Sequence, residues 1–417
     1  MVASHPSIGF IDDNYLIWER LSKAKWIDPK VAGEIEQYML NGWYSNSDMY
    51  ASYLVKRGAR ATRYVPSRKV DEVTRSRHAL GHEVVRLPVG RDGLSATSMA
   101  AFARQFLREQ SRNGIDVVHY GNYYSTFFVP AFLFRLKSRL VAQFSGGEPP
   151  ASGGLSGLRW LIGPRFSLRS LDALLLGNTS AEDKRQAGIL SDYYRIDQDK
   201  VRLFPGLCVD EELFKERDRG ESIRSLGFER ELGHIVSVGY IPKEPVPFLG
   251  KNPYLILRLF ASLDRRMVSA HRLHFLGFGP GVEDLKLEAR RLGVAENTSF
   301  HGLVQHHLLP LYYSASELVV NPYPAADLWT GTVTMEAQAC ARPVAMFKRA
   351  PWAPAEPPGG YLLSLDPQGG KAQMESILEN PEAMREKGRE ATRLPEKFFL
   401  GNVGPRLTEI YAGVLGR

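Results

Sequence analysis

The stretch Asp327-Leu-Trp-Thr-Gly-Thr-Val-Thr-Met-Glu336-Ala-Gln-Ala-Cys-Ala-Arg-Pro343 decides how this 417-residue sequence is interpreted. Its pattern predicts a loop that opens into a helix over residues 332–341, followed by a buried strand over 343–347. A glycine at a junction between loop and helix allows the backbone to approach a ligand closely. The first amides of such a helix can hold phosphate oxygens. We therefore expect this junction to face a phosphate-bearing ligand.

Glu336 lies about one turn inside the predicted helix, on an otherwise apolar segment. A carboxylate in this position can accept hydrogen bonds from two neighbouring hydroxyl groups, such as those of a ribose. The alternative is a buried glutamate whose hydrogen bonds are satisfied by backbone groups. Both interpretations remain open from these residues alone.

Strand-like and helix-like segments alternate on both sides of this stretch. In the first half, strand patterns occur at 7–11, 62–65, 82–87, 116–119, 140–144, 173–176 and 201–204, and helical spacing at 27–40, 48–56 and 97–112. In the second half, strand patterns occur at 234–238, 273–276, 298–300, 318–320 and 343–347, and helical spacing at 253–263, 283–292, 307–314 and 332–341. We interpret the charged stretch between the halves, 215–231, as an interdomain linker.

Repeated β-α-β units indicate mostly parallel sheets with helices on both faces. The expected fold class is α/β, with two Rossmann-like doubly wound domains facing a central cleft. Ligands in such sheets bind beyond the carboxyl ends of the strands. The length suits two domains of about 200 residues each. We place them at 1–218 and 219–396, with a closing helix at 397–417.

Composition narrows the class of protein. Apolar residues make up 44% and charged residues 24% of the chain, as in globular rather than disordered proteins. The longest apolar run, 123–134, is short of the roughly 20 residues that span a bilayer. No secretory signal pattern precedes it, so a cytoplasmic protein is expected. Cys208 and Cys340 are the only cysteines, which argues against a disulfide framework and against a structural zinc site.

The positive charge is concentrated in the first half. Residues 51–170 contain 19 Lys/Arg and 7 Asp/Glu. Such an excess indicates an anionic partner, either a phospholipid surface, a phosphorylated acceptor or nucleic acid. Ordinary solubilising charge explains it equally well. We do not expect nucleic acid, because the region contains no recognition module, and peripheral contact with the inner face of a membrane stays open.

The sequence resembles the family-4 retaining glycosyltransferases, which have the GT-B fold. The resemblance is strongest over 235–344, where the landmarks are weak singly but specific in their order and spacing. They are Val238-Gly239, Lys251-Asn-Pro-Tyr-Leu-Ile, Phe275-Leu-Gly-Phe-Gly-Pro-Gly281, Thr298-Ser-Phe-His-Gly302, Leu309-Pro-Leu-Tyr-Tyr, Val320-Asn-Pro322 and Met335-Glu-Ala-Gln-Ala-Cys-Ala-Arg-Pro-Val344. Looser matches extend it over nearly the full chain, and imply an acceptor-binding first domain and a nucleotide-sugar-binding second domain.

Residue by residue, the resemblance implies a donor site. Lys251 corresponds to the lysine that contacts the donor diphosphate, with Lys243 as a rival because 245–250 is an insertion. Glu336 corresponds to the second glutamate of a paired-glutamate motif, which binds the nucleotide ribose. The implied donor contacts on glycines, backbone amides and their neighbours are Gly42, Gly239, Tyr240, Gly277, Gly279, Gly302, Gly331, Thr332 and Val333.

Three positions depart from the family pattern. Tyr240 stands where an arginine is usual, and Ser145 stands where a histidine is usual, before Gly146 on the acceptor side. The first glutamate of the pair falls on Leu328, so we expect a one-residue shift that lets Asp327 contact the sugar hydroxyls. These departures remove a phosphate-binding cation and two sugar-contacting groups.

The implied activity is retaining transfer of a hexosyl-type sugar from a nucleotide-diphosphate donor to an acceptor hydroxyl. Lys251, Glu336 and Asp327 would carry it, and the acceptor would be a glycan, a lipid or a small molecule, with a cell-envelope glycan or glycolipid as the candidate. A non-catalytic nucleotide-sugar-binding or glycan-assembly partner with a degenerate site is the alternative. No cofactor and no essential metal are expected, because helix amides and a lysine can neutralise the leaving diphosphate.

Two motifs that could suggest a metal are interpreted otherwise. Asp197-Gln-Asp199 is expected in a solvated turn, and His306-His307 at a helix N-terminus. A nicotinamide-dependent oxidoreductase would require Gly-x-Gly-x-x-Gly at the first strand-to-helix turn. Gly277-Phe-Gly-Pro-Gly281 does not have that spacing.

Overall fold

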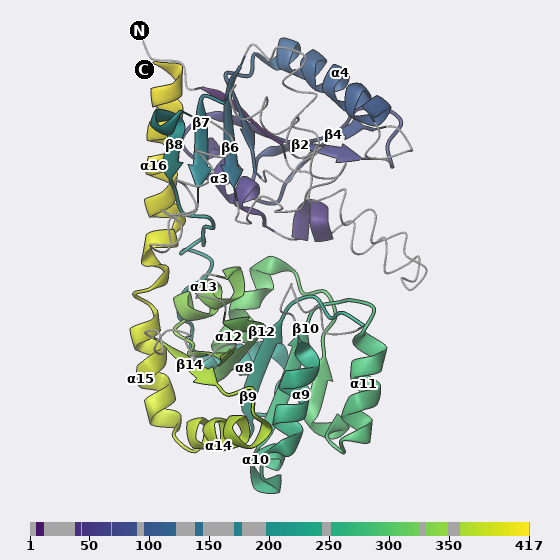
Figure 1. Ribbon diagram of the computed structural model, residues 1–417, viewed down its shortest axis with the longest axis vertical. Helices are drawn as coiled ribbons and strands as arrows, with labels where there is room; N and C mark the ends of the chain where they lie inside the picture. Colours follow the sequence, from purple (N-terminus) through teal and green to yellow (C-terminus); the bar gives the residue numbers. More distant parts are fainter. Residues whose placement is uncertain are drawn as a thin grey trace. The chain divides into compact units, whose positions relative to one another are not determined.

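The computed structural model describes residues 6–11, 38–42, 44–67, 69–89, 96–121, 138–144, 171–176, 197–243, 252–325, 331–348 and 359–416. The chain forms two compact units (Figure 1). Unit 1 comprises Met1–Cys208 together with Leu400–Arg417, and unit 2 comprises Val209–Phe399. Unit 2 thus begins ahead of the expected boundary at 218, and unit 1 includes the C-terminal helix.

Unit 1 is built on an eight-stranded sheet in the order β3-β4-β2-β1-β5-β6-β7-β8. Every neighbouring pair is parallel except β3 with β4. The strands are β1 (Ser7–Ile11), β2 (Arg60–Ser67), β3 (Thr74–Arg77), β4 (Glu83–Pro88), β5 (Val117–Tyr120), β6 (Arg139–Phe144), β7 (Ala173–Leu176) and β8 (Val201–Leu203).

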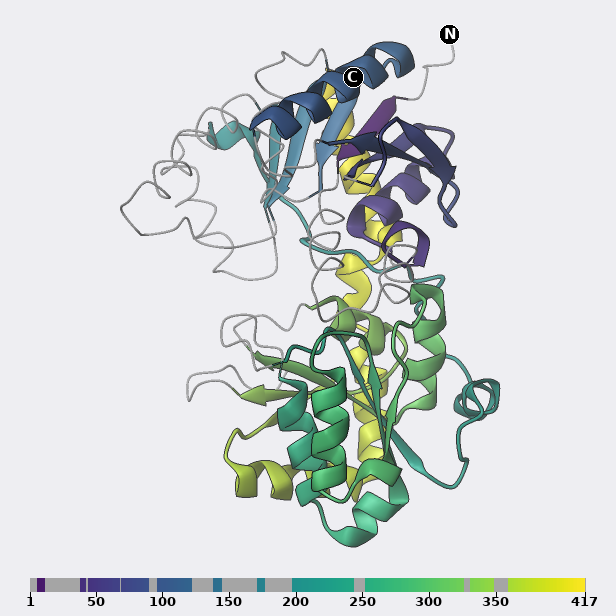
Figure 2. The same ribbon diagram turned by 90° about the vertical axis from the view of Figure 1, so that its right-hand side faces the viewer.

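Helices cover both faces of this sheet (Figure 2). Helix α4 (Ala96–Asn113) packs Phe102 and Phe106 against sheet residues such as Tyr64 and Val118. Helices α3 (Asn46–Val55) and α16 (Leu400–Leu415) pack against each other. The Nδ1 atom of His119, on β5, lies 2.6 Å from the hydroxyl oxygen of Tyr411 on α16. This buried hydrogen bond joins the C-terminal helix to the centre of the sheet.

Unit 2 has a six-stranded sheet, entirely parallel, in the order β11-β10-β9-β12-β13-β14. The strands are β9 (Gly233–Val238), β10 (His271–Leu276), β11 (Thr298–Phe300), β12 (Leu318–Ala325), β13 (Val344–Lys348) and β14 (Gly360–Leu363). The chain starts in the middle of the sheet, builds outward to β11 and then returns to the other side of β9. This is the doubly wound order expected from the sequence.

The helices of unit 2 also lie on both faces. Those on one face are α9 (Pro253–Ser262), α10 (Arg265–Ala270), α11 (Val282–Arg291) and α14 (Pro367–Leu378), and those on the other are α8 (Arg219–Leu226), α12 (Leu309–Ala315), α13 (Thr332–Ala339) and α15 (Pro381–Ala391). A core on the first face joins β9, β10, β12 and β13 to α9 and α11. Short 3-10 helices, η3 (Ala295–Asn297), η4 (His306–Leu308) and η5 (Pro395–Phe398), connect several elements.

The prediction that 215–231 is an interdomain linker is wrong. This stretch contains α8, whose Ser222 and Ile223 are buried and which packs against α12. Asp218 caps the helix by accepting a hydrogen bond from the Glu221 amide at 2.7 Å, and Gly227 ends it with a left-handed φ of 68°. Most of the charged residues flank this helix, and only Arg219, Glu221 and Arg224 lie within it. Among the described residues, no helix is long and apolar enough to cross a membrane.

Candidate functional site

The strand order of unit 2 places a topological switch point between β9 and β12. These two strands are hydrogen-bonded neighbours, yet the chain leaves β9 toward one edge of the sheet and β12 toward the other. Ligands of doubly wound sheets bind in the crevice outside the carboxyl ends of such strands. The segment after β9 begins with Gly239, and the connection after β12 leads to Gly331 and α13. The expected glycine junction therefore belongs to the switch point.

The N-terminus of α13 is an accessible, positively polarised end. Gly331 is its N-cap, and the Gly331 carbonyl accepts the first intrahelical bond, from the Met335 amide at 3.0 Å. Thr332 is exposed and Val333 half-buried, whereas the helix from Thr334 onward is buried. The first turn contains no acidic residue that would offset the helix dipole. The leading amides of this turn can therefore receive the oxygens of an anion.

Neither the backbone conformation nor the described neighbours require a glycine at position 331. The φ of −95° and ψ of 147° of Gly331 suit any residue. A Cβ added here would lie 3.8 Å from the Asn321 amide nitrogen and 3.9 Å from the Thr334 hydroxyl, and no described atom is closer. Asn321 is itself fixed by donating to the Thr334 hydroxyl at 2.9 Å. The missing side chain therefore leaves room beside the helix amides.

Glu336 is held by two side chains rather than by backbone. It is only 2% exposed. The Nε2 atom of His306, from η4, lies 2.6 Å from Oε1, and the hydroxyl of Tyr313, from α12, donates to Oε2 at 3.1 Å. The ring of Phe214 packs against both partners. Because a carboxylate can accept about four hydrogen bonds, this network leaves capacity for further hydroxyl donors.

The sequence did not identify these two partners. His306 and His307 do lie in a short helix ahead of α12, as expected, but His306 is buried against Glu336 and His307 is exposed. The two histidines therefore do not act as a pair. An aromatic-rich helix 23 residues before a buried glutamate is a weak signal, because only the tertiary fold brings Tyr313 to it.

The expected donor-site glycines after β9, β10 and β11 come together as one backbone ladder. The amide of Gly239 donates to Leu276 O at 2.9 Å, that of Ile241 to Phe278 O at 2.9 Å, and that of Gly277 to Gly302 O at 2.8 Å. The parallel pairing of the sheet thus continues past the strand ends into the turns that follow them.

Glycine is required at two of these positions by close backbone approach. A Cβ on Gly277 would lie 1.8 Å from Gly239 O, and one on Gly279 would lie 2.0 Å from Ile241 O. Gly302 differs, because its surroundings are open and it adopts a left-handed φ of 65°. The structure thus gives these glycines a structural role in shaping the switch point, apart from any contact with a ligand.

The other expected site residues lie as follows. The ring of Tyr240 packs edge-on against that of Phe278, with centroids 5.9 Å apart, and burial raises the pKa of its hydroxyl. Lys243 is exposed, and its carbonyl accepts a hydrogen bond from Tyr254 at 3.2 Å. Gly42 ends a π-helical turn, Tyr38–Gly42, in unit 1. Four expected residues lie outside the described ranges: Ser145, Gly146, Lys251 and Asp327.

Unit 1 contains a buried polar cluster that the sequence did not reveal. Nη1 of Arg63 lies 3.0 Å from both oxygens of Asp48, and His82 Nε2 lies 3.0 Å from Asp48 Oδ1. His78 is also close, with its Nε2 3.9 Å from the same oxygen. One carboxylate and two histidines are a possible metal-ligand set. The Leu80 amide, however, donates to His78 Nδ1 at 3.1 Å, so this nitrogen is the acceptor. Neutral His78 therefore carries its proton on Nε2, the atom that faces Asp48.

This cluster is an ion-pair network rather than a metal centre. The guanidinium of Arg63 already neutralises the carboxylate that a cation would need. Burial alone would raise the pKa of Asp48, but the charge of Arg63 and the hydrogen bond with His82 hold that pKa well below its usual range. Burial lowers the pKa of His78 to about 4, so it stays neutral. Asp197 and Asp199 lie in an exposed turn, as expected, where Asp197 pairs with Lys200 at 3.2 Å.

Comparison with known proteins assigns the fold. A structure of sucrose-phosphate synthase from Thermosynechococcus elongatus superimposes with a TM-score of 0.69 at 15% identity, covering 99% of this chain and 100% of that one. The structure of HepE from Anabaena in complex with UDP gives a TM-score of 0.65 at 14% identity, covering 98% of this chain and 100% of that one. The two doubly wound units therefore form a GT-B fold, which confirms the expected fold class.

The family assignment rests on the unit that contains the switch point. Residues 238–380 match the family described as "Glycosyl transferases group 1". A D-inositol 3-phosphate glycosyltransferase of Segniliparus rotundus is 31% identical over 221 residues, which are 52% of this chain and 46% of that protein. The chain thus spans about half the length of this relative. These findings confirm the resemblance to the family-4 glycosyltransferases.

Proposed function

We propose that the chain transfers a sugar from a nucleoside diphosphate donor to an acceptor hydroxyl, with the donor bound at the switch point of unit 2. The observation that carries this proposal is the accessible N-terminus of α13, where Gly331 leaves space beside the leading amides. It lies within the segment that matches the glycosyl transferases group 1 family. The HepE structure, which has the same fold, is a complex with UDP, and this supports a nucleotide as the ligand.

The proposed roles follow from the chemistry of each group. The amides of Gly331, Thr332 and Val333 hold the diphosphate, together with the ammonium group of Lys251 or Lys243. Glu336 accepts hydrogen bonds from the ribose hydroxyls with the capacity that His306 and Tyr313 leave.

Gly42 belongs to the donor contacts. On the sugar side, Asp327 contacts the sugar hydroxyls, and Ser145 and Gly146 belong to the acceptor side. The acceptor attacks on the face of the sugar that the diphosphate leaves, which retains the anomeric configuration. Amides and a lysine neutralise the leaving group, so no metal ion is required.

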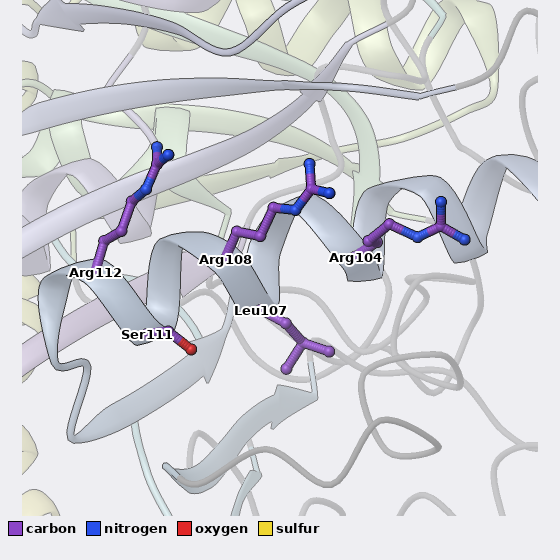
Figure 3. A pocket seen from close by; sticks show the side chains of 5 residues that line it. All are labelled: Arg104, Leu107, Arg108, Ser111 and Arg112. Atoms are coloured by element: carbon purple, nitrogen blue, oxygen red, sulfur yellow. The ribbon is translucent and has the colours of Figure 1, made fainter.

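The proposed acceptor is anionic or linked to a lipid. A relative is named for D-inositol 3-phosphate, so a phosphorylated polyol is the first acceptor to test. Unit 1 also offers a basic helix face for an anionic surface. Arg104, Arg108 and Arg112 follow one another at four-residue spacing along α4 and are exposed (Figure 3). Within 101–113 the one acidic residue, Glu109, is buried and paired with Arg75 and, at 3.5 Å, with Arg112.

This arginine stripe suits peripheral binding to the inner leaflet of a membrane. The test is sedimentation with vesicles that contain anionic lipid, at low and at high salt. The wild-type chain should sediment at low salt, and the variant with Arg104, Arg108 and Arg112 changed to Gln should not. Equal sedimentation of the two proteins would contradict membrane contact through α4.

A second candidate is a non-catalytic nucleotide-sugar-binding protein. It is favoured by Tyr240 and Leu328, which replace an arginine and a glutamate of the family pattern. Donor turnover separates the two candidates. A catalyst should slowly hydrolyse its donor without an acceptor and faster with one, whereas a binder should be stabilised by the donor but leave it intact.

The proposal is tested by thermal unfolding in the presence of UDP, GDP, ADP and their sugar conjugates. A ligand at 100 times its dissociation constant stabilises the folded state by about 2.7 kcal/mol, which gives a shift of a few degrees in the midpoint. At least one nucleotide should shift the transition of unit 2, and the same nucleotide's sugar conjugate should be hydrolysed. Absence of binding across the whole panel would refute both candidates.

A further inference from the structure

Unit 2 contains a second polar cavity, at the far end of α13 from Gly331. Its volume is about 320 Å³. It opens at the amino ends of β12 and β13, because its lining includes Glu317, just before β12, and Arg342, just before β13. The eight-residue helix α13 is about 12 Å long, so the cavity is distinct from the proposed donor site.

Arg342 is the side chain that marks this cavity as a site. It is only 9% exposed, and its Nε is buried without a hydrogen-bond partner. No carboxylate of the described residues lies within 4 Å of its guanidinium. A buried arginine normally has an anionic partner, because an unpaired buried charge is costly. The guanidinium has no ion-pair partner among the described residues, lines the cavity and is available to an anion that enters it.

The backbone around Arg342 is fixed rather than free to adjust. At the end of α13, the Ala341 amide donates to Gln338 O at 2.9 Å and the Arg342 amide to Ala337 O at 3.0 Å. These two bonds form a Schellman motif, with Ala341 in the left-handed conformation at φ 57°. The guanidinium is therefore presented by a rigid turn.

Four further arginines line the cavity. Its positively charged side chains therefore outnumber its negatively charged ones. The arginines are Arg217, Arg219, Arg385 and Arg389, and the acids are Glu216, Asp218 and Glu317. Two of the acids are already engaged, since Asp218 caps α8 and Glu317 lies 3.0 Å from His271 Nε2. Glu216, which is exposed, and Glu382, which lies 3.9 Å from Arg385, are left to offset the five arginines. The cavity is thus electropositive.

We propose that this cavity binds a small phosphate-type polyanion, with Arg342 as its central ligand and Arg389 at its rim. Arginine forks match the oxygens of a phosphate group, and several forks around one cavity suit a ligand that carries more than one charge. A cavity of this volume holds pyrophosphate or a small phosphate ester. Inorganic and metabolite phosphates share this chemistry, and the experiment distinguishes them.

The test is calorimetric titration of the full chain with pyrophosphate, inorganic phosphate and a hexose phosphate. Wild type should bind pyrophosphate, and Arg342→Met should bind it about 10- to 100-fold more weakly, the range that hydrogen bonds to a charged group contribute. Arg389→Met should weaken it by a smaller factor. Tighter binding of the hexose phosphate than of pyrophosphate assigns the site to a metabolite, and the reverse order assigns it to the inorganic anion.

Two controls keep the result interpretable. Gly331→Ala should weaken only the pyrophosphate that binds at the proposed donor site, and should retain the separate binding event that Arg342→Met loses. Arg342→Met should unfold at the wild-type temperature or above without ligand, because methionine removes a buried charge that has no ion-pair partner while filling a similar volume. Superimposable pyrophosphate isotherms for wild type and Arg342→Met would overturn the proposal. If Arg342→Met does not fold, unchanged binding by Arg389→Met would overturn it.

Discussion

Substitution of Glu336 separates its structural role from its proposed role in binding. Glu336→Ala removes a buried hydrogen bond from His306 and another from Tyr313. An unsatisfied buried group costs about 1–3 kcal/mol, and the cavity left behind adds to this. We therefore expect Glu336→Ala to lower the free energy of unfolding of unit 2 by about 3–5 kcal/mol.

Glu336→Gln preserves the volume and most of the contacts. The glutamine oxygen can accept from His306, and its amide can donate to the hydroxyl oxygen of Tyr313, so only the charge assistance is lost. The expected cost is about 1–2 kcal/mol. Tyr313→Phe removes a single hydrogen bond, at about 1 kcal/mol, and leaves the carboxylate in place. Urea unfolding, followed for the transition of unit 2, measures the three values.

Nucleotide binding completes this test. Glu336→Gln should weaken the bound nucleoside diphosphate about tenfold, because a charged acceptor for the ribose hydroxyls becomes neutral. Tyr313→Phe is the matched control and should bind with wild-type affinity. Two results would refute the reasoning: a cost below about 1 kcal/mol for Glu336→Ala, or an equal loss of affinity in Glu336→Gln and Tyr313→Phe.

Three further predictions concern stability. Gly404→Ala should destabilise unit 1 by about 1–3 kcal/mol, because its Cβ would lie 2.4 Å from the ring of Tyr53. Gly413→Ala, in open space on the same helix, should stabilise unit 1 by up to about 1 kcal/mol. Urea unfolding that gives the opposite order of stability would contradict the packing of α16. Burial lowers the pKa of His119 to about 3, so its contribution is present above the unfolded pKa of 6.5 and is lost as the pH falls toward 3. His119→Gln should therefore reduce the loss of stability between pH 7 and pH 5 by about 2 kcal/mol, and an unchanged pH profile would show that His119 titrates normally. Gly279→Ala should cost about 2–4 kcal/mol in unit 2, because its Cβ would meet the backbone of the neighbouring turn at 2.0 Å, and retention of wild-type stability would contradict the glycine ladder.

Much of the fold could be predicted because parallel strands leave a strong pattern. Strands such as β9 and β13 are buried on both faces and read as short apolar runs between turns. The edge strand β3 was missed, because three of its four residues are exposed and it contains two arginines. Helix α8 was taken for a linker for the same reason, since only two of its eight residues are buried.

The site could be located from the sequence, but not its internal partners. Gly331 and Glu336 were found because a glycine before an apolar helix that contains a single carboxylate is a local pattern. The network of His306 and Tyr313 around Glu336 depends on how η4 and α12 pack, which no local pattern encodes. The cluster around Asp48 joins α3, β2 and the turn before β4 in the same way.

The central claim is that the N-terminus of α13 holds the diphosphate of a nucleotide. The most direct test is calorimetric titration of UDP, GDP and ADP into wild type and Gly331→Ala, with Gly413→Ala as the matched glycine control. The added Cβ makes only ordinary van der Waals contacts with the described residues, so folding should be unaffected, but it occupies the room beside the leading amides. The account predicts that Gly331→Ala keeps wild-type stability and binds the preferred nucleotide at least about tenfold more weakly, the effect of losing one or two charge-assisted hydrogen bonds. Equal nucleotide affinity in wild type, Gly331→Ala and Gly413→Ala would contradict it.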